Sequence, residues 1–342
     1  MIELPPLPQD PPRPPEPRDP NAPAGPHVTL FDLGLPLAQA RVVAVPVPYQ
    51  ATVSSGAGTV DGPRALLEAS AAIDLADPAF GEPWREGIAA LAEPEAIRSL
   101  SESTERLARA ARRGGDDGGR VDAAGRLVAD WVRGTVAALM ASGRRPLLIG
   151  GEHATSLGAF EAAAADGPFG MLQIDAHADL RHAYEGWRSS HASVMARALE
   201  LDGVVRLVQV GLRDVCPEEV TRARAEPERV TWYSDDRLAR RQAGGEPFEV
   251  VAREIVERLP ERVWLSLDVD GLDPALCPGT GTPVPGGLGW REMGRLLECL
   301  RDSGRALVGA DLVEIGPGEW DGQVAARLAY RLAAIAAGCR PG

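Results

Sequence analysis

The sequence has no apolar run approaching the roughly 20 residues that a membrane-spanning helix needs. Its N-terminus lacks the basic and then apolar arrangement of a secretory signal peptide. Cysteines are few and far apart, with no C-x-x-C pair, so structural thiols in a reducing compartment are expected instead of disulfides. These absences predict a cytoplasmic protein that has no membrane partner.

Positive charge is also in short supply. The chain has 36 lysines and arginines against 49 aspartates and glutamates, which gives a formal net charge of -13. A nucleic-acid surface needs a basic stripe that attracts phosphates, so no nucleic-acid partner is expected. An acidic protein suits a small cationic ligand better, although acidity also serves solubility alone.

The 342 residues divide into a short arm and a long folded part. Residues 1–28 hold eleven of the 30 prolines and cannot form a helix or a ladder strand, so they predict a disordered N-terminal arm. The whole chain is 44% hydrophobic, which is ordinary for a globular protein. We expect residues 29–342 to form a single catalytic domain.

Beyond the arm, short apolar β-rich runs alternate with segments of helical spacing or Gly-rich loops. The runs are 41–47, 146–150, 170–175, 204–211, 229–233, 262–270 and 306–313. Apolar residues between 121 and 140 recur at three and four residues, and 290–302 and 321–337 are similar, which predicts amphipathic helices. Residues 112–120 read as a surface loop. This alternation predicts an α/β fold with a mostly parallel sheet and helices on both faces.

One segment concentrates ligand-type side chains. The stretch "LQIDAHADLRHAYEGWRSSHASVMAR", residues 172–197, carries three of the five histidines and alternates Asp175, His177 and Asp179 directly after an apolar run. If the chain stays extended there, these three side chains project from the same face. His153 follows another predicted strand, and ligands collect at the carboxyl ends of strands in such sheets. The segment predicts a convergent polar site.

A second aspartate pair strengthens the metal interpretation. Asp268 and Asp270 have the same two-residue spacing at the end of another predicted strand. Several aspartates crowded in a low-dielectric cleft repel one another unless divalent cations lie between them. Oxygen ligands outnumber imidazoles and no cysteine ligand is evident, which favours manganese(II) over a structural zinc. So many carboxylates would balance two ions better than one.

Four segments resemble the signatures of the ureohydrolase family, which contains arginase and agmatinase. They are "GGEHATSLGAF" (150–160), "IDAHADLR" (174–181), "SLDVDGLDPALCPGTGTPVPGGL" (266–288) and "ADLVEIGP" (310–317). Two further segments, 54–70 and 184–197, are more similar to agmatinases than to arginases. The resemblance implies a three-layer α/β/α domain, two manganese(II) ions per subunit, and an agmatinase-like hydrolase. Such an enzyme cleaves a guanidino compound to urea and an amine by a hydroxide held between the two ions.

The resemblance also implies residue roles. One ion would be bound by His153, Asp175, Asp179 and Asp268, and the other by Asp175, His177, Asp268 and Asp270. His191 would be a proton shuttle in the mouth of the cleft, and it would contact substrate. Glu314 would pair with the substrate guanidinium, and Asp179 would orient the attacking hydroxide. These expectations make His191, Asp179 and Glu314 the candidate catalytic residues.

Several alternatives stay open. The substrate could instead be guanidinobutyrate, guanidinopropionate, arginine or formimidoylglutamate, and the native metal could be nickel or cobalt. A non-catalytic metal-binding scaffold is the rival from another class, against which the presence of both His191 and Glu314 argues. Gly316 stands where the family often has asparagine, so the local loop is not defined by the resemblance. The resemblance suggests a homotrimer or homohexamer.

Overall fold

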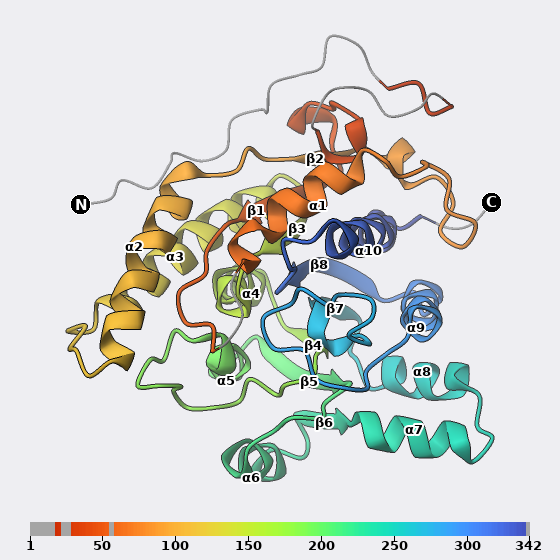
Figure 1. Ribbon diagram of the computed structural model, residues 1–342. Coiled ribbons are helices and arrows are strands. Elements are labelled where there is room, and N and C mark those ends of the chain that lie inside the picture. Colours follow the sequence, from red (N-terminus) through yellow and green to blue (C-terminus); the bar gives the residue numbers. More distant parts are fainter. Residues whose placement is uncertain (1–17, 22–28, 55–57, 340–342) are drawn as a thin grey trace.

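A single parallel sheet organises the chain (Figure 1). The computed structural model describes residues 18–21, 29–54 and 58–339. Within these residues the sheet has eight strands in the order β2-β1-β3-β8-β7-β4-β5-β6, and every neighbouring pair is parallel. The strands are β1 Val42–Val47, β2 Ile88–Ala90, β3 Arg145–Gly150, β4 Phe169–Ile174, β5 Val204–Val210, β6 Val230–Tyr233, β7 Arg262–Asp268 and β8 Ala306–Val313.

The central strands are buried on both faces, which is why their sequences are nearly continuous apolar runs. All six residues of β4 are buried, as are six of the seven residues of β7. The β-branched and aliphatic side chains of these strands pack into two apolar clusters, one on each face of the sheet.

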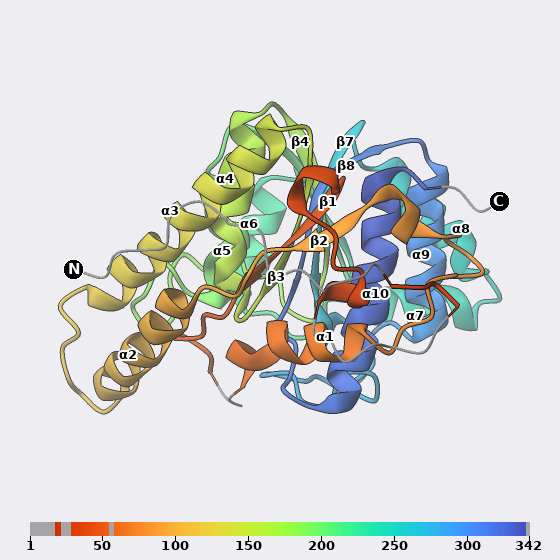
Figure 2. The ribbon, with the colours of Figure 1, turned by 90° about the horizontal axis from the view of Figure 1, so that it is seen from above.

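Helices cover both faces (Figure 2). On one face lie α1 and α7 to α10, and on the other α2 to α6. Their bounds are α1 Gly62–Ser70, α2 Glu95–Arg112, α3 Arg120–Ala141, α4 Leu157–Ala165, α5 Val194–Ala198, α6 Pro217–Ala225, α7 Asp235–Ala243, α8 Phe248–Glu257, α9 Trp290–Asp302 and α10 Glu319–Ala337. Short 3₁₀ turns fill several connections: Leu30–Asp32, Leu37–Gln39, Thr59–Asp61, Pro83–Glu86, His153–Ser156, His191–Ser193 and Val269–Gly271. The molecule is therefore a three-layer α/β/α fold, as the sequence predicts.

The sequence-based element predictions hold for seven of the eight strands described. The helix predicted at 290–302 has the same bounds as α9, and the loop predicted at 112–120 lies between α2 and α3. Strand β2 was missed because its three residues are too few to show a period. The predicted disorder of residues 1–28 lies outside the described residues, apart from 18–21.

The carboxyl ends of β3, β4, β7 and β8 lie side by side at one edge of the sheet. Four of the sequence signatures follow these strand ends, so the topology brings together segments that are more than 100 residues apart. None of the helices in the described part of the chain is both long and apolar enough to span a bilayer.

Candidate metal centre

The Asp-His-Asp segment is not extended, which corrects the geometry expected from the sequence. Strand β4 ends at Ile174, and Asp179 has a left-handed backbone with φ of 54°. Ala176 and Ala178 still point into the core, where both are fully buried. The alternation of polar and buried apolar residues is therefore kept. The loop, however, places Asp175, His177 and Asp179 in two adjacent groups instead of at one point.

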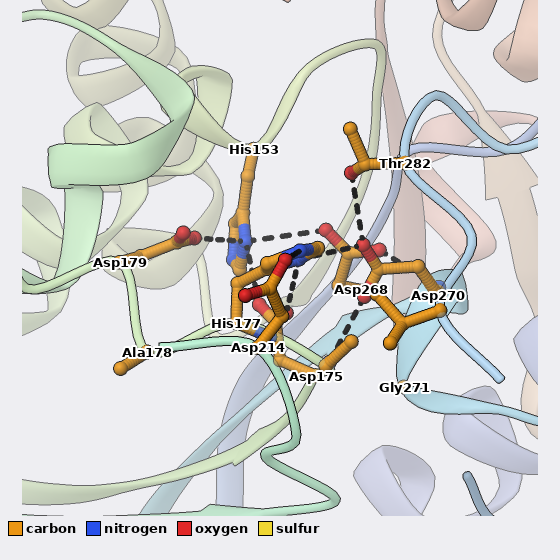
Figure 3. A network of polar contacts seen from close by, with 12 residues as sticks. His153, Asp175, His177, Ala178, Asp179, Asp214, Asp268, Asp270, Gly271 and Thr282 are labelled. Carbon is orange, nitrogen blue, oxygen red and sulfur yellow. Dashed lines mark hydrogen bonds and ion pairs between the residues drawn. The ribbon is translucent and has the colours of Figure 1, made fainter. Parts of the chain in front are cut away.

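The first group of ligand atoms surrounds His153, which begins the 3₁₀ turn after β3. Its Nδ1 lies 2.9 Å from a carboxylate oxygen of Asp179 and 3.2 Å from one of Asp175. A carboxylate oxygen of Asp268, the last residue of β7, lies 3.5 Å away. Figure 3 shows Asp179 and Asp268 on opposite sides of the His153 ring.

The second group is adjacent and shares Asp175 with the first. Nδ1 of His177 lies 2.9 Å from a carboxylate oxygen of Asp270 and 3.7 Å from the second oxygen of Asp175. Among the residues that the structure describes, two groups bring at least three possible ligand atoms within 4.8 Å of one another: His153, Asp175 and Asp179, and Asp175, His177 and Asp270. Asp175 thus offers one oxygen to each group, which is the arrangement expected of a bridging carboxylate.

The loop after β7 holds the second aspartate pair in place. The backbone N–H of Asp270 donates to Oδ1 of Asp268 at 2.9 Å, and the backbone N–H of Ala176 donates to Oδ1 of Asp270 at 3.0 Å. Gly271 passes so close to the other loop that a Cβ there would lie 2.5 Å from the backbone nitrogen of Asp175. The glycine in "DVDG" therefore lets the two acidic loops approach each other.

Burial and mutual repulsion perturb the ionisation of these groups. Burial, and then the neighbouring aspartates, raise the pKa of Asp268 well above its usual range. Burial and the charge of Asp175 raise the pKa of Asp179 to about 7. Burial alone would lower the pKa of His177, but contacts with Asp175 and Asp270 raise it to about 12. Without cations, the cluster compensates its own charge by binding protons.

The donor set fits divalent metal. His153 Nδ1 is fully buried, has no hydrogen-bond partner, and faces three carboxylates within 3.5 Å. A buried nitrogen lone pair among carboxylate oxygens is a ligand environment, and its oxygen-rich composition suits manganese(II) better than a thiolate-seeking ion. All six side chains that the sequence predicts as ligands are therefore brought together.

A cavity of about 370 Å³ opens above the second group. It is lined by Ser54, His177, Asp179, Arg181, Tyr184, His191, Ala192, Asp214, Glu219, Thr282, Pro283 and Val284. Its volume suits a small organic molecule. His191, predicted for the cleft mouth, is in its wall.

His191 is held by a hydroxyl that the sequence did not reveal. Its Nδ1 lies 3.1 Å from Oγ1 of Thr52, and its Nε2 lies 3.3 Å from Oγ of Ser54. Thr52 Oγ1 donates its hydrogen to Oε2 of the buried Glu152 at 3.1 Å, so it accepts from His191. The contact with Thr52 favours the Nδ1–H tautomer of His191, whose Nε2 lies beside Ser54 in the cavity wall.

Glu314 lies deeper than the sequence predicts. It follows β8 with φ of 60°, is 6% exposed, and accepts a hydrogen bond from the backbone N–H of His153 at 2.9 Å through Oε1. It is not among the residues that line the cavity. The neighbouring Gly316 is explained by space, because a Cβ there would lie 2.4 Å from the backbone of Gly279.

Other side chains weighed from the sequence have supporting positions. Cys277 is buried, and burial raises the pKa of its thiol, so it is not a nucleophile. His182 is exposed and outside both groups. Asp321 accepts from the backbone N–H of Gly279 at 2.8 Å and orders the loop that follows β7.

The fold and the paired His-Asp groups define the class of the protein: an α/β protein with two adjacent groups of side chains able to hold metal at the carboxyl edge of a parallel sheet. The arginase family pattern matches residues 40–338, and the chain belongs to the arginase family.

Individual relatives agree. The chain is 34% identical over 304 residues to the N(1)-aminopropylagmatine ureohydrolase of Synechocystis, covering 86% of this chain and 89% of that one. It is 34% identical over 190 residues to the agmatinase of Bacillus anthracis, covering 55% of this chain and 61% of that one. The crystal structure of the agmatine ureohydrolase of Thermoplasma volcanium has a TM-score of 0.69 at 28% identity, covering 88% and 91% of the two chains.

Proposed function

We propose that the chain is an agmatinase-like hydrolase that cleaves the guanidino group of a linear cationic amine to urea and an amine. The observation that carries the proposal is a pair of His-Asp groups that share Asp175 and lie at the floor of a cavity with carboxylates in its wall. Asp214 is the most exposed of these carboxylates, at 70% for its side chain. A cationic substrate would be attracted to this wall.

Two manganese(II) ions would be bound by the six side chains. The first ion would be held by His153, Asp175, Asp179 and Asp268, and the second by Asp175, His177, Asp268 and Asp270. Divalent ions at these positions would act as Lewis acids and lower the pKa of water, which makes a nucleophile available at neutral pH. The distances from Asp175 to both histidines support the sharing of Asp175, and Asp268 lies 3.5 Å from His153.

The chain's own groups would then handle the substrate and the protons. Asp179 is in the cavity wall and would orient the attacking water. His191 presents Nε2 at the mouth, where it would accept a proton from the attacking water and pass it to the departing amine. Glu314 would attract the guanidinium through its charge. Its Oε1 already accepts a hydrogen bond from the backbone N–H of His153, so it is not free to pair directly with the substrate. Holding the guanidino carbon near the nucleophile supplies the positional advantage.

Agmatine is the first candidate substrate, and N1-aminopropylagmatine is the second. The relative in Synechocystis that matches 86% of this chain carries the second name, while the agmatinase match covers 55%. Both compounds are linear cations with a terminal guanidino group. A dicarboxylate such as formimidoylglutamate fits less well, because the only cationic guanidinium in the described cavity wall, Arg181, lies over the ring of Tyr184.

A urea assay tests the proposal. Purified protein loaded with manganese would be offered agmatine, N1-aminopropylagmatine, arginine, guanidinobutyrate, guanidinopropionate and formimidoylglutamate, with kcat and KM measured for each active compound. Nickel- and cobalt-loaded protein would be compared in parallel. We expect urea from at least one of the two cationic amines. Stoichiometric metal with no urea or formamide from any compound would favour the scaffold alternative.

Thr52→Val should lower kcat about tenfold, as expected when an acid-base group worth 10²- to 10⁴-fold loses its orientation. Valine keeps the shape but removes the hydroxyl that links Glu152 to His191. Metal content and KM should stay near those of the wild type. Thr104→Val is the control, because Thr104 is also buried and its hydroxyl donates to the backbone carbonyl of Leu100 within α2. An unchanged kcat in Thr52→Val would show that this hydroxyl does not position His191.

We further propose that residues 29–342 act as one catalytic domain in the cytoplasm, assembled as a homotrimer or homohexamer. Support for one domain is that strands from residue 42 to residue 313 share one sheet. Light scattering of the full chain would measure the assembly.

A further inference from the structure

A row of polar side chains crosses the interior of the sheet beneath the metal ligands. Backbone register aligns one residue from each of five adjacent strands. These residues, which we call the polar row, are Trp232 of β6, Gln209 of β5, Gln173 of β4, Ser266 of β7 and Asp311 of β8. Register alone places them at one level across the sheet, on the face where their side chains can meet.

Burying the polar row at the centre of the sheet has a free-energy cost. Gln173, Gln209, Ser266 and Asp311 are fully buried. A buried amide or hydroxyl costs about 1 to 3 kcal/mol unless it is hydrogen-bonded, and even satisfied it offers little net stability over an apolar side chain. Outside the row, the charged or hydrogen-bonding side chains of these strands are few: Arg206, Thr231, Tyr233, Arg262, Trp264 and Asp268. The side chains of the polar row therefore indicate a role other than stabilising the fold.

The first half of the row is a directed chain of hydrogen bonds that ends at Asp175. The indole N–H of Trp232 can only donate, and it donates to Oε1 of Gln209 at 2.6 Å. That contact orients the amide of Gln209, whose Nε2 donates to Oε1 of Gln173 and also to the backbone carbonyl of Ala178 at 2.8 Å. Nε2 of Gln173 is left to donate to Oδ2 of Asp175 at 2.7 Å.

The second half is a directed chain that ends at His153. The indole N–H of Trp264 donates to Oδ2 of Asp311 at 2.6 Å. Ser266 Oγ donates its one hydrogen to Asp311 Oδ1 at 2.8 Å. Ser266 Oγ then accepts from Nε2–H of His153 at 2.9 Å. The lone pair of His153 is thereby placed on Nδ1, the atom that faces the three aspartates.

We propose that the polar row consists of positioning residues that fix the donor atoms of the metal centre, with each half governing a different ligand. This inference rests on the metal centre proposed above. The half that starts at Trp232 orients Asp175, which both groups share, so it controls the affinity for both ions. The half that starts at Trp264 sets the tautomer of His153, which is in one group only, so it controls the affinity for one ion.

The proposal assigns a function to a side chain far from the ligands. Trp232 lies on β6, two strands from β4, which is roughly 10 Å at the usual strand spacing. Without its N–H, Gln209 loses one of the contacts that orient its amide, while its Nε2 still donates to Gln173 and to the carbonyl oxygen of Ala178. The N–H that Gln173 presents to Asp175 is then oriented less firmly, and any turn of that amide would place an oxygen against the carboxylate and disturb both ions.

The test is a titration of metal-free full-length protein with Mn²⁺, in which a competing chelator and the electron paramagnetic resonance signal of free Mn²⁺ give the two stepwise affinities. Trp232→Phe keeps the ring and removes the donor, and Gln209→Met is a second variant that breaks the same chain. Tyr233→Phe is the matched control, because Tyr233 is the next residue of β6 and loses one hydrogen bond, to Glu254, away from the row. Ser266→Ala tests the other half.

We expect Trp232→Phe and Gln209→Met to weaken both affinities about tenfold or more, within the tenfold to hundredfold range of outer-shell partners. Ser266→Ala should weaken one affinity and spare the other, and Tyr233→Phe should match the wild type. Thermal unfolding of the metal-free variants separates this effect from general destabilisation. Wild-type affinities in Trp232→Phe and Gln209→Met, or an equal loss in Tyr233→Phe, would overturn the role of the row alone. A wild type that binds no stoichiometric Mn²⁺ would overturn the proposed metal centre with it.

Discussion

Asp175→Asn should lower kcat/KM by about three orders of magnitude or more, because metal catalysis supplies several kcal/mol and each 1.36 kcal/mol is tenfold in rate. Asp175 is the one side chain common to both groups of ligand atoms. Asparagine keeps the size but removes a charge and replaces one oxygen by an amide nitrogen that cannot bind a cation. Both ions are therefore expected to bind more weakly, and elemental analysis should find clearly fewer than two manganese ions per chain.

Asp273→Asn is the matched control for this variant. Asp273 is also a loop aspartate of the "DVDGLDP" segment, but its Oδ1 accepts from the backbone N–H of Ala275 at 2.9 Å and it belongs to neither ligand group. It should retain two ions and nearly full activity. Full metal content and turnover in Asp175→Asn would rule out a bridging role for this carboxylate.

The fold was predictable because the sheet is buried on both faces. Each of the seven runs named from the sequence is a mostly apolar segment, and such runs separated by segments of helical periodicity predict a parallel sheet. Strand β2 was not predicted because Ile88–Ala90 has too few residues to show any pattern. The strand order was out of reach, since the register between strands far apart in sequence depends on packing that no local pattern records.

The ligands were predictable for an electrostatic reason, and their supports were not. Aspartates at two-residue spacing after two apolar runs are costly unless a cation joins them, so the pattern identified both pairs. The left-handed turn at Asp179 gives no sequence signal. Gln173 and Gln209 are isolated polar residues within "GMLQI" and "RLVQV". Only the register between β4 and β5 reveals that they are neighbours. Thr52 reaches His191 from 139 residues away, which no spacing argument could show.

Asp268→Asn should abolish tight manganese binding and, in metal-free protein, raise the free energy of unfolding by about 1 to 3 kcal/mol, the usual cost of a poorly compensated buried polar group. The two effects have opposite signs because Asp268 is useful only with a cation beside it. Burial and the charges of Asp270 and Asp175 hold its pKa well above the usual range. Asparagine removes that repulsion, and its Oδ1 can still accept from the N–H of Asp270.

The same repulsion predicts how the stability of metal-free wild type depends on pH. Asp179 ionises with a pKa of about 7 when folded and near its ordinary value of 3.8 when unfolded, so the folded state binds more protons between these values and stability falls as pH rises through them. His177, with its pKa raised to about 12 when folded, keeps a proton that the unfolded chain loses above about 6.5, which has the same sign. Metal-free wild type should therefore melt at a higher temperature at pH 5.5 than at pH 8.

Thermal unfolding in the presence of a chelator, at pH 5.5 and pH 8, measures both expectations. Asp268→Asn should melt a few degrees above the wild type at pH 8, as about 1 kcal/mol shifts the melting temperature by 2 to 4 °C in chains of this order of size. The difference should shrink as the pH is lowered, because burial and the charges of Asp270 and Asp175 raise the pKa of Asp268 and favour its neutral form. With saturating manganese the order should reverse, because only the wild type gains binding energy from both ions. A variant that is less stable than wild type without metal at pH 8 would show that the carboxylates do not repel one another, and the charge argument for two cations would lose its basis.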